Sequence, residues 1–194
     1  MNAALPFVLA VLGLLAVPGP TNTLMAGAGA AAGVRRSLPL LAGELGGYVI
    51  AITLWSELVG AAASSQPMIG VVAKLLAAAF LIWSGWKLWN RAGTHPVGGS
   101  ITLQRVFATT LINPKGLVFA FAIFPQVGFT ARLPYLGIFA VLVVVTAIGW
   151  QTLGAVAALS SRGLFTAARV ERVCAIVLVV FAIILIVQTV QGLH

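Results

Sequence analysis

The chain has 194 residues, of which 61% are hydrophobic and only 7% are charged, with a mean hydropathy of +1.11. A soluble core of this length could not bury so much apolar surface, so the composition predicts a protein of the lipid bilayer. The net charge of +8 does not indicate nucleic-acid binding, because the basic residues are scattered between apolar runs and form no recognisable binding module.

Six segments are long and apolar enough to span a bilayer as helices, which predicts an all-α integral membrane protein. They cover residues 4–32, 38–60, 68–89, 104–127, 134–159 and 173–191, and they form one transmembrane domain over residues 1–194. No Lys or Arg precedes the first segment, so it does not have the charged start of a signal peptide and is expected to be retained.

The first segment is interrupted by Pro18-Gly19-Pro20, followed by Thr21 and Asn22. A proline removes a backbone donor and clashes with the preceding turn, so this segment is predicted to be a broken helix. Freed carbonyls could accept hydrogen bonds from an ammonium group, and the new helix start could bind a carboxylate. These five residues are therefore predicted to bind substrate. The alternative is that the prolines only kink the helix for packing.

The second segment carries Glu44, one of only three carboxylate side chains in the chain. Desolvation favours its protonated form, whereas a nearby cation favours its ionised form, and switching between them would couple a proton to transport. Glu44 is therefore the predicted proton-coupling residue. Tyr48, at i+4 on the same helix face, is predicted to line the site. The alternative for Glu44 is a structural salt bridge to Arg35 or Arg36.

The fourth segment contains a second break, Asn113-Pro114-Lys115. Lys115 lies ten positions beyond Arg105, too deep for a simple helix-end anchor, and burying it costs about 2.5 to 3.5 kcal/mol. It is predicted to hold a substrate carboxylate or to pair with Glu44, and all three residues of the break are predicted to bind substrate. Snorkelling of Lys115 to the interface and an interhelical hydrogen bond of Asn113 are the alternatives.

Small residues at i and i+4 predict close helix packing at Gly29 and Gly33 and at Gly43 and Gly47, and such faces would permit a homodimer. In the fifth segment, Gln151 either lines the same site or makes an interhelical hydrogen bond.

Basic residues are concentrated in and beside the first, third and fifth connectors. This distribution predicts that these connectors are cytoplasmic and that both termini face away from the cytoplasm. Each half of the chain holds three predicted helices and one break. The sequence thus predicts two inverted three-helix repeats, about 1–92 and about 104–194, joined by a cytoplasmic connector over about 90–103. Broken helices 1 and 4 would meet at the midplane, where secondary transporters bind substrate.

No metal site or cofactor is expected, because His95, His194 and Cys174 form no cluster with metal-ligand spacing. An enzyme is not expected either, since the predicted spans offer no Ser-His-Asp set and no pair of nearby carboxylates. A passive channel or an exporter of an inorganic ion is the alternative to a coupled transporter.

Several motifs together resemble the lysine-exporter and threonine-exporter (LysE/RhtB) family. They are Pro18-Gly19-Pro20-Thr21-Asn22, Gly33 with Arg35-Arg36-Ser37-Leu38-Pro39, Gly43-xxx-Gly47 and Asn113-Pro114-Lys115. The resemblance implies a bacterial inner-membrane exporter of amino acids or related small metabolites that is energised by the proton gradient. Glu44 occupies a position expected to be apolar in that family, so its coupling role would be specific to this chain.

Overall fold

The computed structural model describes residues 4–90, 100–159 and 167–192, and within these ranges all regular structure is helical. In chain order the helices are α1 (Ala4–Ala16), α2 (Pro20–Ala32), α3 (Val34–Ser37), α4 (Leu40–Ser65), α5 (Pro67–Asn90), α6 (Leu103–Leu111), α7 (Pro114–Val118), the π-helix η1 (Phe119–Ile123), α8 (Phe129–Leu159) and α9 (Ala167–Gln191). Most of the predicted connector 90–103, including His95, lies outside the described residues, as do His194 and the side chain of Cys174.

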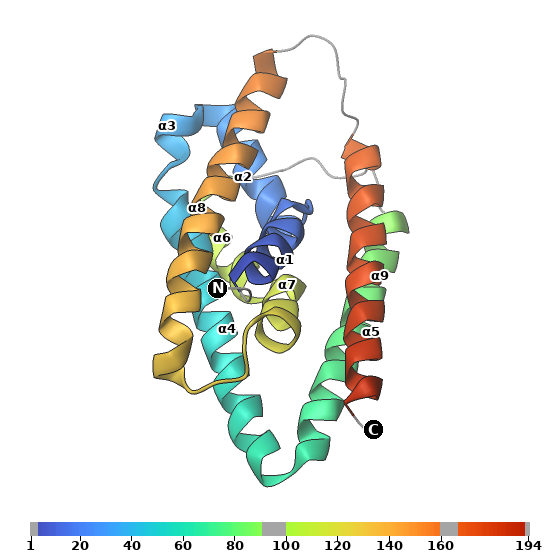
Figure 1. The fold of residues 1–194 in the computed structure, drawn as a ribbon. Helices are drawn as coiled ribbons and strands as arrows, with labels where there is room; N and C mark the ends of the chain where they lie inside the picture. Colours follow the sequence, from blue (N-terminus) through green and yellow to red (C-terminus); the bar gives the residue numbers. More distant parts are fainter. Residues whose placement is uncertain (1–3, 91–99, 160–166, 193–194) are drawn as a thin grey trace.

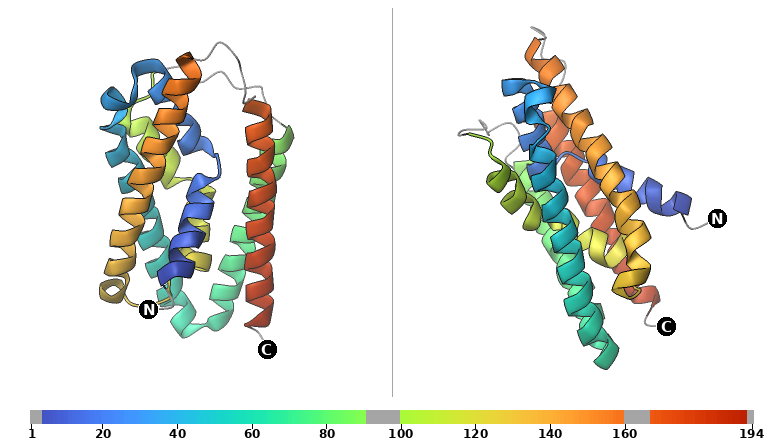
Figure 2. Two further views of the ribbon diagram at one scale, coloured as in Figure 1. Left: turned by 45° about the horizontal axis from the view of Figure 1, so that its top comes forward. Right: turned by 90° about the vertical axis from the view of Figure 1, so that its left-hand side faces the viewer.

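Long helices surround two short, bent segments (Figure 1). Helix α5 packs along α9, and α4 and α8 form the opposite side of the molecule. Helices α1 and α7 lie between these two sides in both Figure 1 and the left view of Figure 2. The two segments that contain proline breaks therefore meet between the long helices, and the N-terminal end of α1 projects to one side in the right view of Figure 2.

Two helices in the described part of the chain, Met68–Asn90 and Phe129–Leu159, are each long and apolar enough to cross a membrane. The pairs α1 with α2 and α6 with α7–η1 bring this number to four if each bent pair forms one span. Large apolar side chains such as Val141, Val145 and Leu153 lie exposed on α8, where a bilayer would cover them. Two to four spans are thus supported, and the six-span inverted repeat stays a prediction.

The two bends lie at the prolines. Helices α1 and α2 meet at 64°, and α6 and α7–η1 meet at 47°. Pro20 and Pro114 are the first residues of α2 and α7, where a proline loses no intrahelical hydrogen bond. Each break thus ends one helix and starts another.

Some predicted boundaries were wrong. The fifth predicted segment begins at Phe129 instead of residue 134, because Pro134 has the backbone angles of a helix and removes only one donor near its start. The fourth ends at Ile123 instead of residue 127, since Phe124 precedes a proline and is extended. The sequence also gave no expectation of the one-turn helix α3.

Glycines allow α2 and α8 to touch through their backbones. A Cβ added at Gly29 would lie 1.9 Å from the carbonyl oxygen of Gln151, and one added at Gly154 would lie 1.9 Å from that of Ala26. Each helix therefore presents a glycine to the other, and only a residue without a side chain fits at either position.

A second close approach joins α4 to α6. A Cβ at Gly43 would lie 2.7 Å from the Leu103 carbonyl oxygen, and one at Gly47 would lie 2.7 Å from the Thr110 Cβ, which confirms the predicted packing role of this pair. Gly33 differs from the prediction, because nothing lies near it. It ends α2 with a positive φ of 76°, a conformation that favours glycine. These packing glycines serve contacts within the chain, and the possible homodimer stays an expectation.

Candidate functional site

The carbonyl groups freed by the first break are occupied by side chains of the protein. The Asn22 amide donates to the carbonyl oxygens of Leu15 and Val17, at 2.7 and 2.8 Å. At the start of α2, the Gly19 carbonyl oxygen accepts hydrogen bonds from both the backbone N–H and the hydroxyl of Thr23, each at 2.9 Å. Asn22, predicted to bind substrate, therefore uses its buried amide to hold the break in shape.

Lys115 connects the two breaks. The Asn113 side chain caps α7 by accepting a hydrogen bond from the Lys115 backbone N–H at 3.1 Å. The Lys115 ammonium reaches across and donates to the Val17 carbonyl oxygen. Its side chain is buried and passes close to Gly19, where an added Cβ would lie 3.3 Å from the Lys115 Cε. The side chain is thus held inside the protein and does not snorkel to an interface.

Hydroxyl and amide groups from three helices form a buried network beside Lys115. The Thr110 hydroxyl donates to the Val106 carbonyl at 2.8 Å, so its proton is used within α6. The Thr21 hydroxyl, 3.1 Å away, must therefore donate to Thr110. Thr21 in turn accepts from the Asn113 amide at 3.0 Å, and the same amide donates to the Tyr48 hydroxyl at 3.4 Å. The directions of these hydrogen bonds are fixed by Thr110.

Glu44 completes the group from α4. It is only 2% exposed, and its Oε2 atom has no hydrogen-bond partner among the described residues. Its carboxylate lies close enough to the Lys115 ammonium for an electrostatic interaction. Arg35 and Arg36, the partners in the alternative interpretation, lie exposed on α3. The structure therefore brings Glu44 together with the second break, as one of the two sequence-based interpretations expected.

The arrangement places one ammonium, one carboxylate and several neutral donors and acceptors at the junction of two broken helices. Such a junction can hold a small polar solute away from lipid. In the described residues, no group of three or more His, Cys, Asp or Glu side chains could hold a metal ion.

Comparison with known proteins decides the family. The model of the LysE type translocator family matches residues 12–189. The chain belongs to the LysE family. The family resemblance seen in the motifs is thus confirmed. The family is described as one of translocators, and the apolar helices of this chain support a multi-pass membrane protein.

Several bacterial relatives are similar over part of their length. An uncharacterised membrane protein of Vibrio cholerae is 29% identical over 56% of the chain and 57% of the relative. A leucine efflux protein of Enterobacter sp. is 28% identical over 62% of the chain and 61% of the relative. A homoserine/homoserine lactone efflux protein of Salmonella typhimurium is 33% identical over 48% of the chain and 49% of the relative. The chain therefore spans about half to three-fifths of the length of these relatives. No solved structure matches significantly.

Two residues of this LysE-family chain, Thr110 and Arg132, have contacts that the sequence did not reveal, and Gln151 makes one of the two kinds of contact expected for it. Thr110 accepts from Thr21 and so sets the direction of the hydroxyl network. The signal that could have revealed it is its position one turn before Asn113, on the side of the break. Arg132, expected in a connector, is buried in the first turns of α8. Gln151 donates to the Ser37 carbonyl oxygen at 2.9 Å, so it makes the interhelical hydrogen bond and fixes α8 to α3.

Proposed function

We propose that this chain exports an amino acid or a related small metabolite from the bacterial cytoplasm, as a secondary transporter of the inner membrane. Family membership supports the transport class. The substrate class is supported by the names of the relatives, which include efflux proteins for leucine, for cysteine and O-acetylserine, and for homoserine.

The observation that carries the proposal is the burial of Lys115 and Glu44 in one cluster where the two helix breaks meet. An amino acid carries a carboxylate and an ammonium, and these groups complement the lysine and the glutamate. In the proposed complex, Lys115 transfers from the Val17 carbonyl to the substrate carboxylate. The substrate ammonium then supplies the hydrogen bond that Glu44 Oε2 lacks.

The remaining predicted residues would shape and polarise this site. The prolines and Gly19 break the helices, and the start of α2 presents backbone amides and the positive end of its dipole. Thr21, Asn113 and Tyr48 offer neutral hydrogen-bonding groups beside the two charges. The proposed substrate-binding residues are thus Pro18, Gly19, Pro20, Thr21, Asn22, Tyr48, Asn113, Pro114 and Lys115.

Proton antiport would follow from competition at Glu44. The carboxylate can accept either a proton or the substrate ammonium, and a buried carboxylate with neither is costly. Export would leave Glu44 to take up a proton from outside, which it would release to the cytoplasm when the next substrate binds. One proton would then enter for each substrate that leaves.

The proposed arrangement in the membrane has six spans in two inverted repeats, with both termini in the periplasm. The bends in the first segment and in the corresponding segment of the second half support the repeat. The basic residues around the first, third and fifth connectors support the orientation.

The first experiment compares the metabolites released by cells that express the native chain, Lys115→Ala or Lys87→Ala at matched membrane levels. Lys87 is a matched control, because it lies over the Trp83 ring in the last turn of α5, outside the cluster. We expect a metabolite that the native chain and the Lys87 variant release and the Lys115 variant does not. Equal release by all three would remove Lys115 from the site.

The compound identified in this way is then tested in liposomes with Glu44→Gln. If Glu44 couples the proton, the variant exchanges labelled substrate but does not concentrate it against a pH gradient. Equal concentration by the variant and the native chain would refute the coupling role. Movement that is neither saturable nor gradient-dependent would favour the passive channel.

A further inference from the structure

A column of aromatic rings extends from the polar cluster toward one end of the molecule. Tyr48, whose hydroxyl belongs to the cluster, contacts Phe119 edge to face with ring centroids 5.5 Å apart. Phe119 packs on Phe139 at 4.8 Å, Phe139 on Phe124 at 5.5 Å, and Phe124 on Phe7 at 5.2 Å. All these rings are buried. A polar solute could not pass from the cluster in this direction without separating them.

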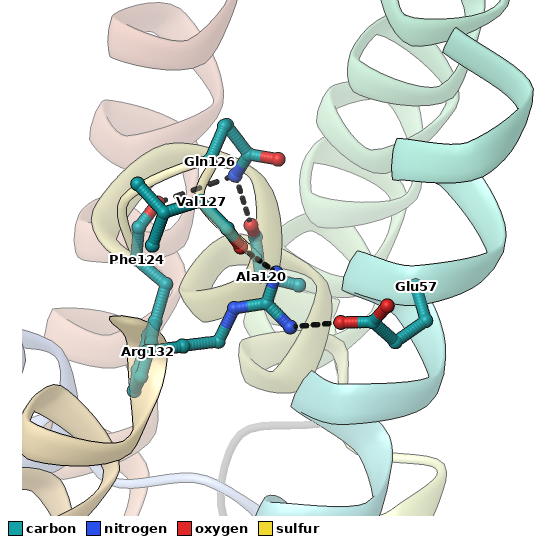
Figure 3. A network of polar contacts seen from close by, with 6 residues as sticks. All are labelled: Glu57, Ala120, Phe124, Gln126, Val127 and Arg132. Carbon is teal, nitrogen blue, oxygen red and sulfur yellow. Dashed lines mark hydrogen bonds and ion pairs between the residues drawn. The ribbon is translucent and has the colours of Figure 1, made fainter. Parts of the chain in front are cut away.

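An ion pair joins α4 to the start of α8, the two helices that contribute Tyr48 and Phe139 to this column. The Arg132 guanidinium, at the start of α8, donates to Glu57 Oε1 on α4 at 2.6 Å and to the Val127 carbonyl at 2.6 Å (Figure 3). Close by, the Gln126 amide donates to the Ala120 carbonyl oxygen of η1 at 2.7 Å. These contacts tie α4 to the segment that joins η1 to α8.

The helix geometry places the ion pair beyond the rings. At 1.5 Å per residue, Glu57 lies about 13 Å along α4 from Tyr48, and Arg132 lies about 10 Å along α8 from Phe139. Helices α4 and α8 run in opposite directions in Figure 1. Both helices therefore pass from the ion pair to the aromatic column and then to the level of the polar cluster.

The opposite side of the cluster is closed by a smaller apolar layer. Leu24 and Met25 follow Thr21 by one turn of α2, and Val106 precedes Thr110 by one turn of α6. These residues pack with Ala147 in a core separate from the one that contains the aromatic column. The structure is therefore closed most firmly on the side that carries Arg132 and Glu57.

We propose that the Glu57–Arg132 ion pair is the latch of a gate whose body is the aromatic column, and that this gate opens when solute passes between the polar cluster and that side of the membrane. The proposal rests on the polar cluster being the transport site. In the orientation proposed above, this is the periplasmic side, so the gate would control release.

The burial of the two partners explains why the pair would favour the closed state. The Arg132 side chain is 4% exposed, whereas the Glu57 side chain is 52% exposed. A buried guanidinium without its anion is unfavourable, so the closed gate needs Glu57. When the gate opens, water reaches the guanidinium and replaces the carboxylate. Removing the Glu57 charge should therefore shift the equilibrium toward the open gate.

The test measures access to a buried cysteine beside the ion pair. Ser56, next to Glu57, is buried, and its hydroxyl has no hydrogen-bond partner among the described residues, so Ser56→Cys is a conservative reporter in a Cys174→Ser background. A membrane-impermeant maleimide is applied to right-side-out and everted vesicles. With Glu57→Gln we expect labelling to become about tenfold faster from the Arg132 side alone, which corresponds to about 1.4 kcal/mol.

Two further variants sharpen the result. Lys87→Gln removes a charge away from the gate and should leave the labelling rate unchanged. Adding Arg132→Gln to Glu57→Gln should bring the labelling rate back toward that of the native chain, because it removes the buried guanidinium whose loss of its anion favours opening. Glu57→Gln keeps the side-chain size and an acceptor oxygen, so it carries the test even if the double variant does not fold.

An unchanged rate in Glu57→Gln would overturn the proposal, because the pair would then only tie two segments together. Equal acceleration from both sides of the membrane would also overturn it, because that result indicates general loosening. The labelling needs no substrate, so it can succeed even if the proposed amino-acid substrate is wrong.

Discussion

Gly154→Ala should destabilise the protein by forcing α2 and α8 apart. The added Cβ would lie 1.9 Å from the carbonyl oxygen of Ala26 and 2.6 Å from its carbonyl carbon. Both atoms belong to the backbone, so no side chain can rotate away. To restore ordinary contact, the helices must separate locally by about 1.5 Å, which also disturbs the reciprocal contact at Gly29. Overpacking of this kind costs about 1 to 3 kcal/mol.

The measurement is the apparent melting temperature of the purified protein in detergent, read from the fraction that remains monodisperse after heating. A cost of about 2 kcal/mol lowers it by roughly 6 °C for a chain of this length. Gly149→Ala is the matched control, because it lies in the same helix with nothing near its added Cβ. Equal melting temperatures for the two variants would refute the backbone contact between α2 and α8.

Two predictions concern the polar cluster. Thr110→Val should lower the free energy of unfolding by about 1 to 3 kcal/mol and reduce transport, because the Thr21 hydroxyl on α2 loses its buried acceptor. Thr152→Val is the control, since its exposed hydroxyl makes the same bond to its own helix at 2.8 Å, and equal melting curves would contradict the network. Gly19→Ala should change transport more than stability, because its Cβ would meet only the flexible end of Lys115. Transport rates equal to those of Gly13→Ala, where nothing lies near the added Cβ, would place Lys115 outside the site.

The parts of the site that the sequence predicted are those with a local signal. Pro20 and Pro114 mark the helix breaks because a proline acts on its own turn wherever the helix packs. Lys115 stands out because a lysine deep in an apolar segment needs a polar partner. Neither argument requires knowledge of which segments lie side by side.

The parts that could not be predicted depend on tertiary contacts. Thr110 has the same local pattern as Thr152, and only the approach of Thr21 gives it a different role. Arg132 lies two positions before Pro134, and the predicted segments placed it in a connector. Its burial depends on Glu57, which is 75 positions away. Long-range pairs of this kind leave no periodic pattern in a single sequence.

Asn22 clarifies how one buried lysine could serve both structure and transport. In the structure the Val17 carbonyl accepts hydrogen bonds from both the Lys115 ammonium and the Asn22 amide. If Lys115 moves to a substrate carboxylate, Asn22 still satisfies that carbonyl, so the break is not left with an orphaned acceptor. The lysine would meanwhile replace a neutral acceptor with a charged one, which forms the stronger hydrogen bond. The kink and the binding site are then one arrangement, in which Asn22 holds the break while Lys115 exchanges partners.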